Sequence, residues 1–137
     1  MYSPRFRLRS YEMMPHEIKV RIMYRLVEAL VLVNAEYLRR HPETPPLYLS
    51  GVRYQQEPFG EEEWQDIPYT LKLGYGDCED LAAWRVAELR VMNNEKARPE
   101  VMGRVLPSGM ALYHIRVTRA DGSIEDPSKL LGMKGQA

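Results

Sequence analysis

The segment from residue 78 to residue 92 constrains the fold more than any other feature, because its apolar residues cover almost the whole circumference of a helix. These residues are Leu81, Ala82, Ala83, Trp84, Val86, Ala87, Leu89, Val91 and Met92. A helix with so little polar surface has to be covered by other elements on most of its sides. Asp77 is the expected N-cap, and Asn93 marks the expected end. The pattern therefore predicts a central, buried helix that begins at Cys78.

A second, longer helix is predicted over residues 15–40. Pro15 suits the first helical position, and Arg39 and Arg40 in the last turn complement the helix dipole. One narrow face is charged, and the wide opposite face carries the apolar residues Ile22, Met23, Leu26, Val27, Leu30, Val33 and Tyr37. This helix is therefore predicted to pack on the core through its apolar face.

The last third of the chain changes to a period of two, which is typical of β-strands. Strands are predicted over residues 101–106, 110–119 and 123–126, with turns between them. Residues 41–60 are rich in proline and glycine and are expected to form a loop, followed by a short acidic helix over 61–67. Because the helices precede an antiparallel meander, we predict an α+β fold in which both helices pack on a small antiparallel sheet.

Length and charge limit the domain count and the partners. A chain of 137 residues predicts one domain, residues 1–137. Residues 1–14 alternate arginines with apolar residues, which suits an extended basic arm or an edge strand. The 19 Lys and Arg residues balance 19 Asp and Glu residues, so nucleic acid is not an expected partner.

The hydropathy pattern argues against a membrane partner and against secretion. The longest uninterrupted apolar run, Ala29 to Val33, is far too short to span a bilayer. The basic N-terminal residues are not followed by the apolar region of a signal peptide. We therefore expect a cytoplasmic protein that does not bind membranes.

Cys78 is the single cysteine, which excludes an internal disulfide and a multi-cysteine zinc site. A lone cysteine is usually a small buried apolar residue. However, the start of a helix directs N–H groups and a positive dipole end at the sulfur, which lowers a thiol pKa. Gly74 and Gly76 let the chain turn just before it, and the Cys78 N–H is a candidate oxyanion donor. Position alone therefore permits a nucleophilic thiol but leaves a small buried residue as the more common interpretation, and the case for a nucleophile depends on its partners.

Two further residues complete a candidate catalytic triad. His114 lies within the predicted strand 110–119, and Asp126 ends the next strand. Cross-strand neighbours have Cβ atoms only about 4.5–5.5 Å apart, which is within hydrogen-bonding reach for Asp and His. Thiol catalysis needs a nucleophile, a base and a group that orients the base. Cys78, His114 and Asp126 are the residues predicted for these three roles.

The motifs around these residues resemble the transglutaminase-like superfamily, and more narrowly the small transglutaminase-like proteins of phage and prophage genomes. The matching motifs are Gly76-Asp77-Cys78-Glu79-Asp80-Leu81-Ala82, Tyr113-His114-Ile115-Arg116-Val117 and Glu125-Asp126-Pro127. The resemblance covers residues 61–131 and implies a papain-like core with a Cys-His-Asp triad. It also implies acyl transfer on a protein or peptide amide, as in cross-linkers, deamidases and amide hydrolases, with no cofactor. A phage origin would place the protein in the host cytoplasm or the virion, with phage or host proteins as partners.

The acidic neighbours of Cys78 leave two alternatives open. Asp77, Glu79 and Asp80 oppose thiolate formation unless they cap the helix or bind a cationic substrate. A metal site of Cys78, Asp80 and His114 is a less favoured interpretation, because the spacing fits no standard site. We therefore expect no metal.

The oxyanion donor and the choice between catalysis and a structural role also stay open. No side-chain oxyanion donor is evident, and we expect Trp64 and Gln65 to be packing residues. A second functional hypothesis is a phage structural or assembly protein that retains the fold with little or no activity. Its contact surfaces would be residues 1–14 and the exposed stripe Arg21–Arg25–Glu28. The complete triad favours the enzyme.

Overall fold

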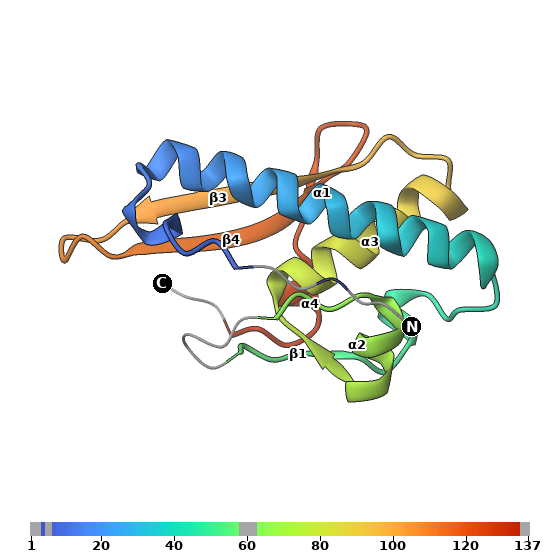
Figure 1. Cartoon of the computed structure of the whole chain (residues 1–137). Coiled ribbons are helices and arrows are strands. Elements are labelled where there is room, and N and C mark those ends of the chain that lie inside the picture. Colours follow the sequence, from blue (N-terminus) through green and yellow to red (C-terminus); the bar gives the residue numbers. More distant parts are fainter. Residues whose placement is uncertain (1–3, 5–6, 58–62, 135–137) are drawn as a thin grey trace.

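The computed structural model describes residue 4, residues 7–57 and residues 63–134. Its helices are α1 (His16–Arg40), α2 (Ile67–Leu73), α3 (Cys78–Met92) and α4 (Pro127–Leu130). Its strands are β1 (Arg53–Tyr54), β2 (Tyr75–Gly76), β3 (Arg98–Val105), β4 (Ala111–Thr118) and β5 (Ile124–Glu125). Two short 3-10 helices, Tyr11–Met13 and Leu47–Leu49, complete the elements. The mixture of helices and strands confirms the predicted α+β class (Figure 1).

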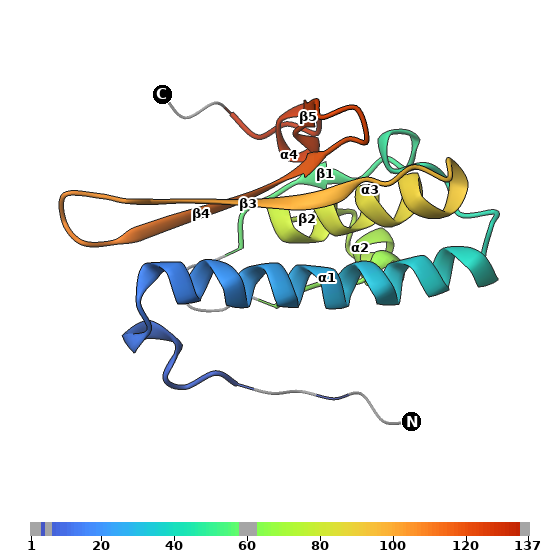
Figure 2. The same cartoon turned by 90° about the horizontal axis from the view of Figure 1, so that it is seen from above.

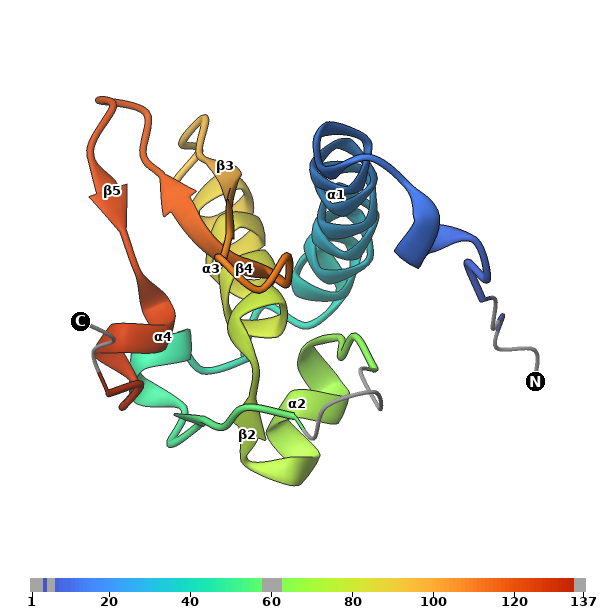
Figure 3. The ribbon, with the colours of Figure 1, turned by 90° about the vertical axis from the view of Figure 1, so that its left-hand side faces the viewer.

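Helix α3 is the central element, as predicted. It begins with a capping box in which the Asp77 N–H donates to Asp80 Oδ2 at 3.0 Å. Leu81, Trp84 and Leu89 are fully buried. The helix packs against α1 and against β4, so it is covered on both sides (Figure 3).

Helix α1 packs on this core through residues spaced three or four apart. Val27, Val31, Ala35 and Leu38 are buried. Val33 was predicted on the same face but is 52% exposed, because at 100° per residue it lies about 120° around the helix from Val27. Pro15 is the N-cap and not the first helical residue. No described helix, α1 included, is a candidate for crossing a membrane.

The main sheet is antiparallel with the order β3-β4-β5, as predicted for the meander. Strands β3 and β4 pair along their whole length, from Arg98↔Thr118 to Val105↔Ala111. Strand β5 pairs with β4 only at Val117 and Thr118. The hairpin of β3 and β4 therefore projects well beyond β5, alongside the N-terminal half of α1 (Figure 2). A separate parallel pair, β1 and β2, was not predicted.

Two local predictions need correction. Residues 1–14 were expected to be extended, but Tyr11–Met13 form a 3-10 helix, and residues 1–3 and 5–6 lie outside the described residues. The short helix expected over 61–67 begins only at Ile67, where Asp66 caps α2, and residues 58–62 lie outside the described residues. Pro68 lies in the first turn of α2, where its missing N–H costs nothing.

Candidate active site

The Cys78 thiol lies at the start of α3, next to strand β4. Cys78 is the first residue of the helix and is partly exposed. The backbone N–H of Ile115 is close enough to the sulfur to stabilise its anion. Ile115 directly follows His114 in β4, so the fold brings the sulfur to the strand that carries the predicted base.

His114 and Asp126 form the hydrogen bond that the sequence predicted. His114 Nε2 lies 2.8 Å from Asp126 Oδ2, and the two side chains are 25% and 12% exposed. Asp126 is held from its other side, because Oδ1 caps α4 by accepting the Lys129 N–H. An ionised carboxylate only accepts hydrogen bonds, so the shared hydrogen belongs to Nε2. This tautomer leaves Nδ1 as the acceptor for a second proton.

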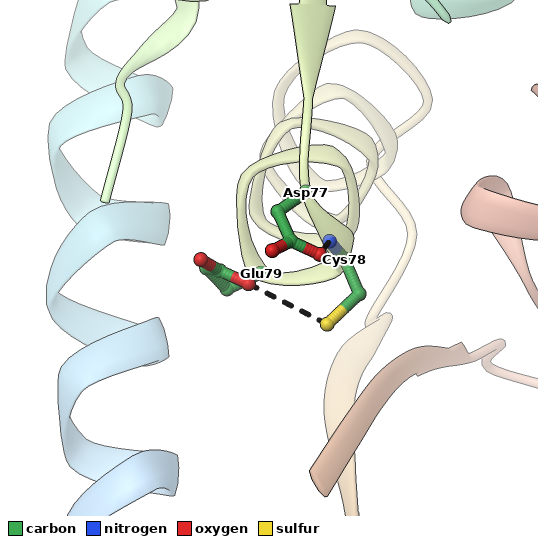
Figure 4. Close-up of side chains that lie close together, drawn as sticks. All are labelled: Asp77, Cys78 and Glu79. Carbon is green, nitrogen blue, oxygen red and sulfur yellow. Dashed lines mark hydrogen bonds between the residues drawn. The ribbon is translucent and has the colours of Figure 1, made fainter. Parts of the chain in front are cut away.

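The thiol itself has a different hydrogen-bond partner from the predicted one. Cys78 Sγ lies 3.4 Å from Glu79 Oε2, and the two side chains point towards each other (Figure 4). In the part of the chain that the structure describes, no hydrogen bond joins the thiol to the His114 ring. The predicted base and its predicted orienting residue are thus paired, while the predicted nucleophile is held by the adjacent carboxylate.

The pKa of the Cys78 thiol is raised and not lowered, which corrects the expectation from the helix dipole. Burial raises this pKa well above the usual value, and the charges of Glu79 and Asp77 raise it further. The Ile115 N–H acts in the opposite direction but is outweighed. In this conformation the sulfur is therefore a neutral thiol near neutral pH.

Asp80 adds less charge near the thiol than the sequence suggested. Burial raises the pKa of its carboxyl to about 8, although hydrogen bonds from the Gln65 and Asp77 N–H groups act to lower it. Asp80 therefore carries a proton over most of the range near neutral pH. Two carboxylates, those of Asp77 and Glu79, remain to oppose ionisation of Cys78.

The predicted oxyanion donor is already engaged. The Cys78 N–H donates to Asp77 Oδ1 at 2.7 Å, so it is not open to a substrate in this conformation. Gln65 is a packing residue, as expected, because its amide donates to Thr70 Oγ1 and to the Tyr75 carbonyl. Trp64 is half-buried against the core.

Tyr54 is a site residue that the sequence analysis missed. Burial raises the pKa of its phenol, and the charges of Asp77, Cys78 and others around the site raise it further. Tyr54 is therefore a hydroxyl donor near the thiol at any ordinary pH. Its position comes from the parallel pairing of β1 with β2, in which Tyr54 pairs with Gly76. A pairing of two residues carries no periodic signal, so the sequence offered no way to find it.

The carboxylates also gather at the start of α3, but not in the combination of Cys78, Asp80 and His114 that was weighed as a metal site. Among the described residues, the ligand atoms of Asp77, Cys78 and Glu79 lie within 4.8 Å of one another, as do those of Glu57, Glu79 and Asp80. His114 belongs to neither group. Asp77 and Asp80 accept N–H groups in the capping box, so helix capping accounts for two of these carboxyl groups.

The contact between Cys78 and Glu79 leads to a testable expectation. Glu79→Gln removes the charge that raises the thiol pKa, so the pH midpoint of Cys78 alkylation by iodoacetamide should move to lower pH. Mass spectrometry of the labelled protein measures this midpoint. Glu36→Gln, which removes an exposed charge on α1, is the control and should leave the midpoint in place. An unchanged or higher midpoint in Glu79→Gln would contradict the role given to Glu79.

Comparisons of the chain with protein-family models, with curated proteins and with solved structures found no match.

Proposed function

We propose that the protein is a cysteine acyl-transfer enzyme of the transglutaminase-like type, with a papain-like core and a Cys78-His114-Asp126 triad. The observation that carries the proposal is the 2.8 Å hydrogen bond between His114 and Asp126, on the strand whose next residue directs its N–H at the Cys78 sulfur. Nucleophile, base and orienting carboxylate come from three separate elements. A fold retained for shape alone does not need all three together.

The reaction follows from the proton positions. As a carbonyl approaches, the Cys78 thiol gives its proton to His114 Nδ1 and forms a bond from sulfur to carbon. His114 then returns that proton to the leaving amine as the bond from carbon to nitrogen breaks. Asp126 holds the Nε2 hydrogen and stabilises the charged ring. Water or a second amine then attacks the acyl-enzyme, with His114 acting again as base, and regenerates the thiol.

The neutral thiol shapes this mechanism. Because its pKa is raised, the sulfur is not a preformed thiolate and depends on His114 to remove its proton during attack. The thiol must also leave Glu79 and turn to the imidazole before it reacts. The Tyr54 hydroxyl, which stays protonated and interacts electrostatically with Cys78, is our candidate donor to the developing oxyanion.

Acylation by p-nitrophenyl acetate tests the proposal. Cys78 is the only cysteine, so a thioester on this chain reports one residue. We expect acetylation of Cys78 with release of p-nitrophenolate near neutral pH, and at least a roughly tenfold lower rate in His114→Ala, because the base is lost. Intact-protein mass spectrometry and absorbance follow the two products.

His41→Ala is the matched control, because His41 is an exposed histidine at the end of α1. It should react at the wild-type rate. Equal acetylation rates in wild type and His114→Ala, with the pH profile of an ordinary thiol, would contradict the enzyme proposal.

A second candidate is a structural or assembly protein that retains the fold with little or no activity. The hydrogen bond from Cys78 to Glu79 favours it, because it holds the thiol protonated and away from the base. In either case a phage setting, with the protein in the host cytoplasm or the virion, is part of the proposal and follows from the sequence resemblance alone.

A further inference from the structure

One edge of β4 is open over most of its length. Strand β3 pairs with all of β4, from Ala111 to Thr118, whereas β5 pairs only with Val117 and Thr118. Among the described parts of the chain, residues 111–116 therefore pair with a strand on one side alone. The hairpin that carries them projects past the rest of the sheet (Figure 2).

The odd-numbered residues of β4 direct their backbone groups to this open edge. In an antiparallel ladder, successive residues point their N–H and C=O groups to opposite sides. Leu106 N–H donates to Met110 O at 2.8 Å on the β3 side, and Arg119 N–H donates to Ser123 O at 2.8 Å on the β5 side. The backbone N–H and C=O groups of the even-numbered residues thus point to β3, and those of the odd-numbered residues point to the open edge. Among the described residues, the N–H and C=O groups of Ala111 and Tyr113 have no hydrogen-bond partner.

The open edge lacks the features that normally protect one. Exposed edges are usually guarded by a charge, a proline or a bulge. From Met110 to Ile115 the strand contains no Lys, Arg, Asp, Glu or Pro. By contrast, the outer edge of β3 carries Pro99 at a position whose N–H would point outward. The β4 edge is therefore open to a further strand.

The edge leads directly to the candidate active site. Ile115, the last odd residue of the open stretch, directs its N–H at the Cys78 thiol. His114 pairs with Met102 across the hairpin, and Leu112 lies two residues before it on the same face. Met102 and Leu112 are 41% and 37% exposed, so they form an apolar surface beside the base.

We propose that the open edge of β4, from Ala111 to Ile115, binds an extended polypeptide segment of the substrate as an added β-strand that runs to the Cys78 thiol. The inference rests on the proposed acyl-transfer function and names its substrate class. An extended peptide is the ligand whose own N–H and C=O groups repeat with the spacing of this edge. Because β3 lies on the far side of β4, alternate side chains of the added strand would lie against Leu112, so apolar residues are expected there.

The hairpin that carries the edge is also anchored to α1, which favours binding because less order has to be gained. The Tyr113 and His16 rings stack with centroids 5.7 Å apart, and this contact fixes the hairpin to the start of α1. Gly103, opposite Tyr113, leaves room for His16, since a Cβ there would lie only 2.7 Å from the His16 ring.

Hydrogen exchange followed by NMR tests the proposal on the Cys78→Ala variant, which keeps the edge but removes the nucleophile. The probe is the peptide acetyl-Lys-Val-Thr-Val-Gln-Val-Thr-Lys-amide at millimolar concentration. We expect the amide protons of Ala111 and Tyr113 to exchange more slowly when the peptide is present. The same peptide with proline in place of each valine cannot form the ladder and should give no protection.

Ala111→Pro provides the second measurement, with Val105→Pro as its matched control. The two residues pair across the hairpin, and each directs its N–H to an outer edge, β4 for Ala111 and β3 for Val105. Ala111→Pro should weaken peptide binding about fivefold through the lost hydrogen bond, whereas Val105→Pro should change it less than about twofold. Circular dichroism checks that both variants fold. If either variant does not fold, the hydrogen-exchange measurement on Cys78→Ala decides whether the edge binds the peptide.

The outcomes separate this inference from the proposed function. Acetylation of Cys78 that depends on His114, without protection of Ala111 and Tyr113 by the peptide, would overturn the edge proposal alone. Protection without such acetylation would support the edge as a peptide-binding site and remove the enzyme. A third outcome is protection of Ala111 and Tyr113 that rises with protein concentration in the absence of peptide, together with dimers in sedimentation. This outcome would show that the edge pairs with a second copy of the chain, and it would overturn the substrate proposal.

Discussion

Trp84→Ala should lower the free energy of unfolding by about 3–5 kcal/mol, the loss expected when a large buried aromatic residue is truncated. Trp84 lies in the middle of α3, is 0% exposed, and is the largest fully buried side chain. Both faces of α3 are covered, so the surrounding residues have little freedom to fill the cavity. Urea denaturation followed by circular dichroism measures the change.

Trp84→Phe is the informative control. The Trp84 Nε1 hydrogen is buried and has no partner in the described part of the chain, and an unsatisfied buried donor is costly. Phenylalanine keeps most of the apolar volume and removes this donor, so its loss of stability should be much smaller than that of alanine. Equal losses in the two variants would contradict the cavity explanation.

The helices were the most predictable part of the fold, because capping residues and apolar patterns are local signals. Asp77 and Asn93 bound α3 as predicted, from Cys78 to Met92. Strand β3 was predicted from Val101 but begins at Arg98. The start was missed because Pro99 argues against a strand in the sequence. A proline is tolerated where its missing N–H would face an outer edge of the sheet, and Pro99 occupies such a position.

The candidate site was predictable only as far as strand order determines it. A hairpin brings neighbouring strands together, so the contact between His114 and Asp126 followed from sequence spacing. The contact between Cys78 and Glu79 did not, because it depends on which way two adjacent side chains turn. The raised thiol pKa depends mainly on burial, which no local pattern reports.

The residue before Asp126 connects the sheet, α3 and the loop after α1. Glu125 accepts hydrogen bonds from Arg85 Nε at 2.6 Å, from Arg119 Nη1 at 2.8 Å and from the Tyr48 hydroxyl. Its side chain is 15% exposed and that of Arg85 is 17% exposed. The pair is therefore mostly removed from water, where losing one partner leaves the other charge unsatisfied.

Glu125→Gln should lower the free energy of unfolding by about 2–3 kcal/mol near neutral pH, because the amide cannot satisfy two guanidinium groups. The same variant should slow Cys78 acetylation if Glu125 fixes the end of β5 from which Asp126 reaches His114. Glu95→Gln is the control, since it removes the other carboxylate bound to Arg119 but leaves Arg85 and Tyr48 with their partner, and its effect should be smaller. Equal effects would contradict a special role for Glu125.

The pH dependence of stability provides an independent check on Glu125. Burial acts to raise the pKa of its carboxyl, but the hydrogen bonds from Arg85 and Tyr48 outweigh burial and leave the pKa below the usual value. A carboxyl with a lowered pKa in the folded state stabilises the protein above its unfolded pKa, and this contribution disappears as the pH falls through the folded value. Wild type should therefore lose stability below about pH 5 more steeply than Glu125→Gln. Parallel denaturation curves for the two proteins across that range would show that the Glu125 carboxylate does not contribute.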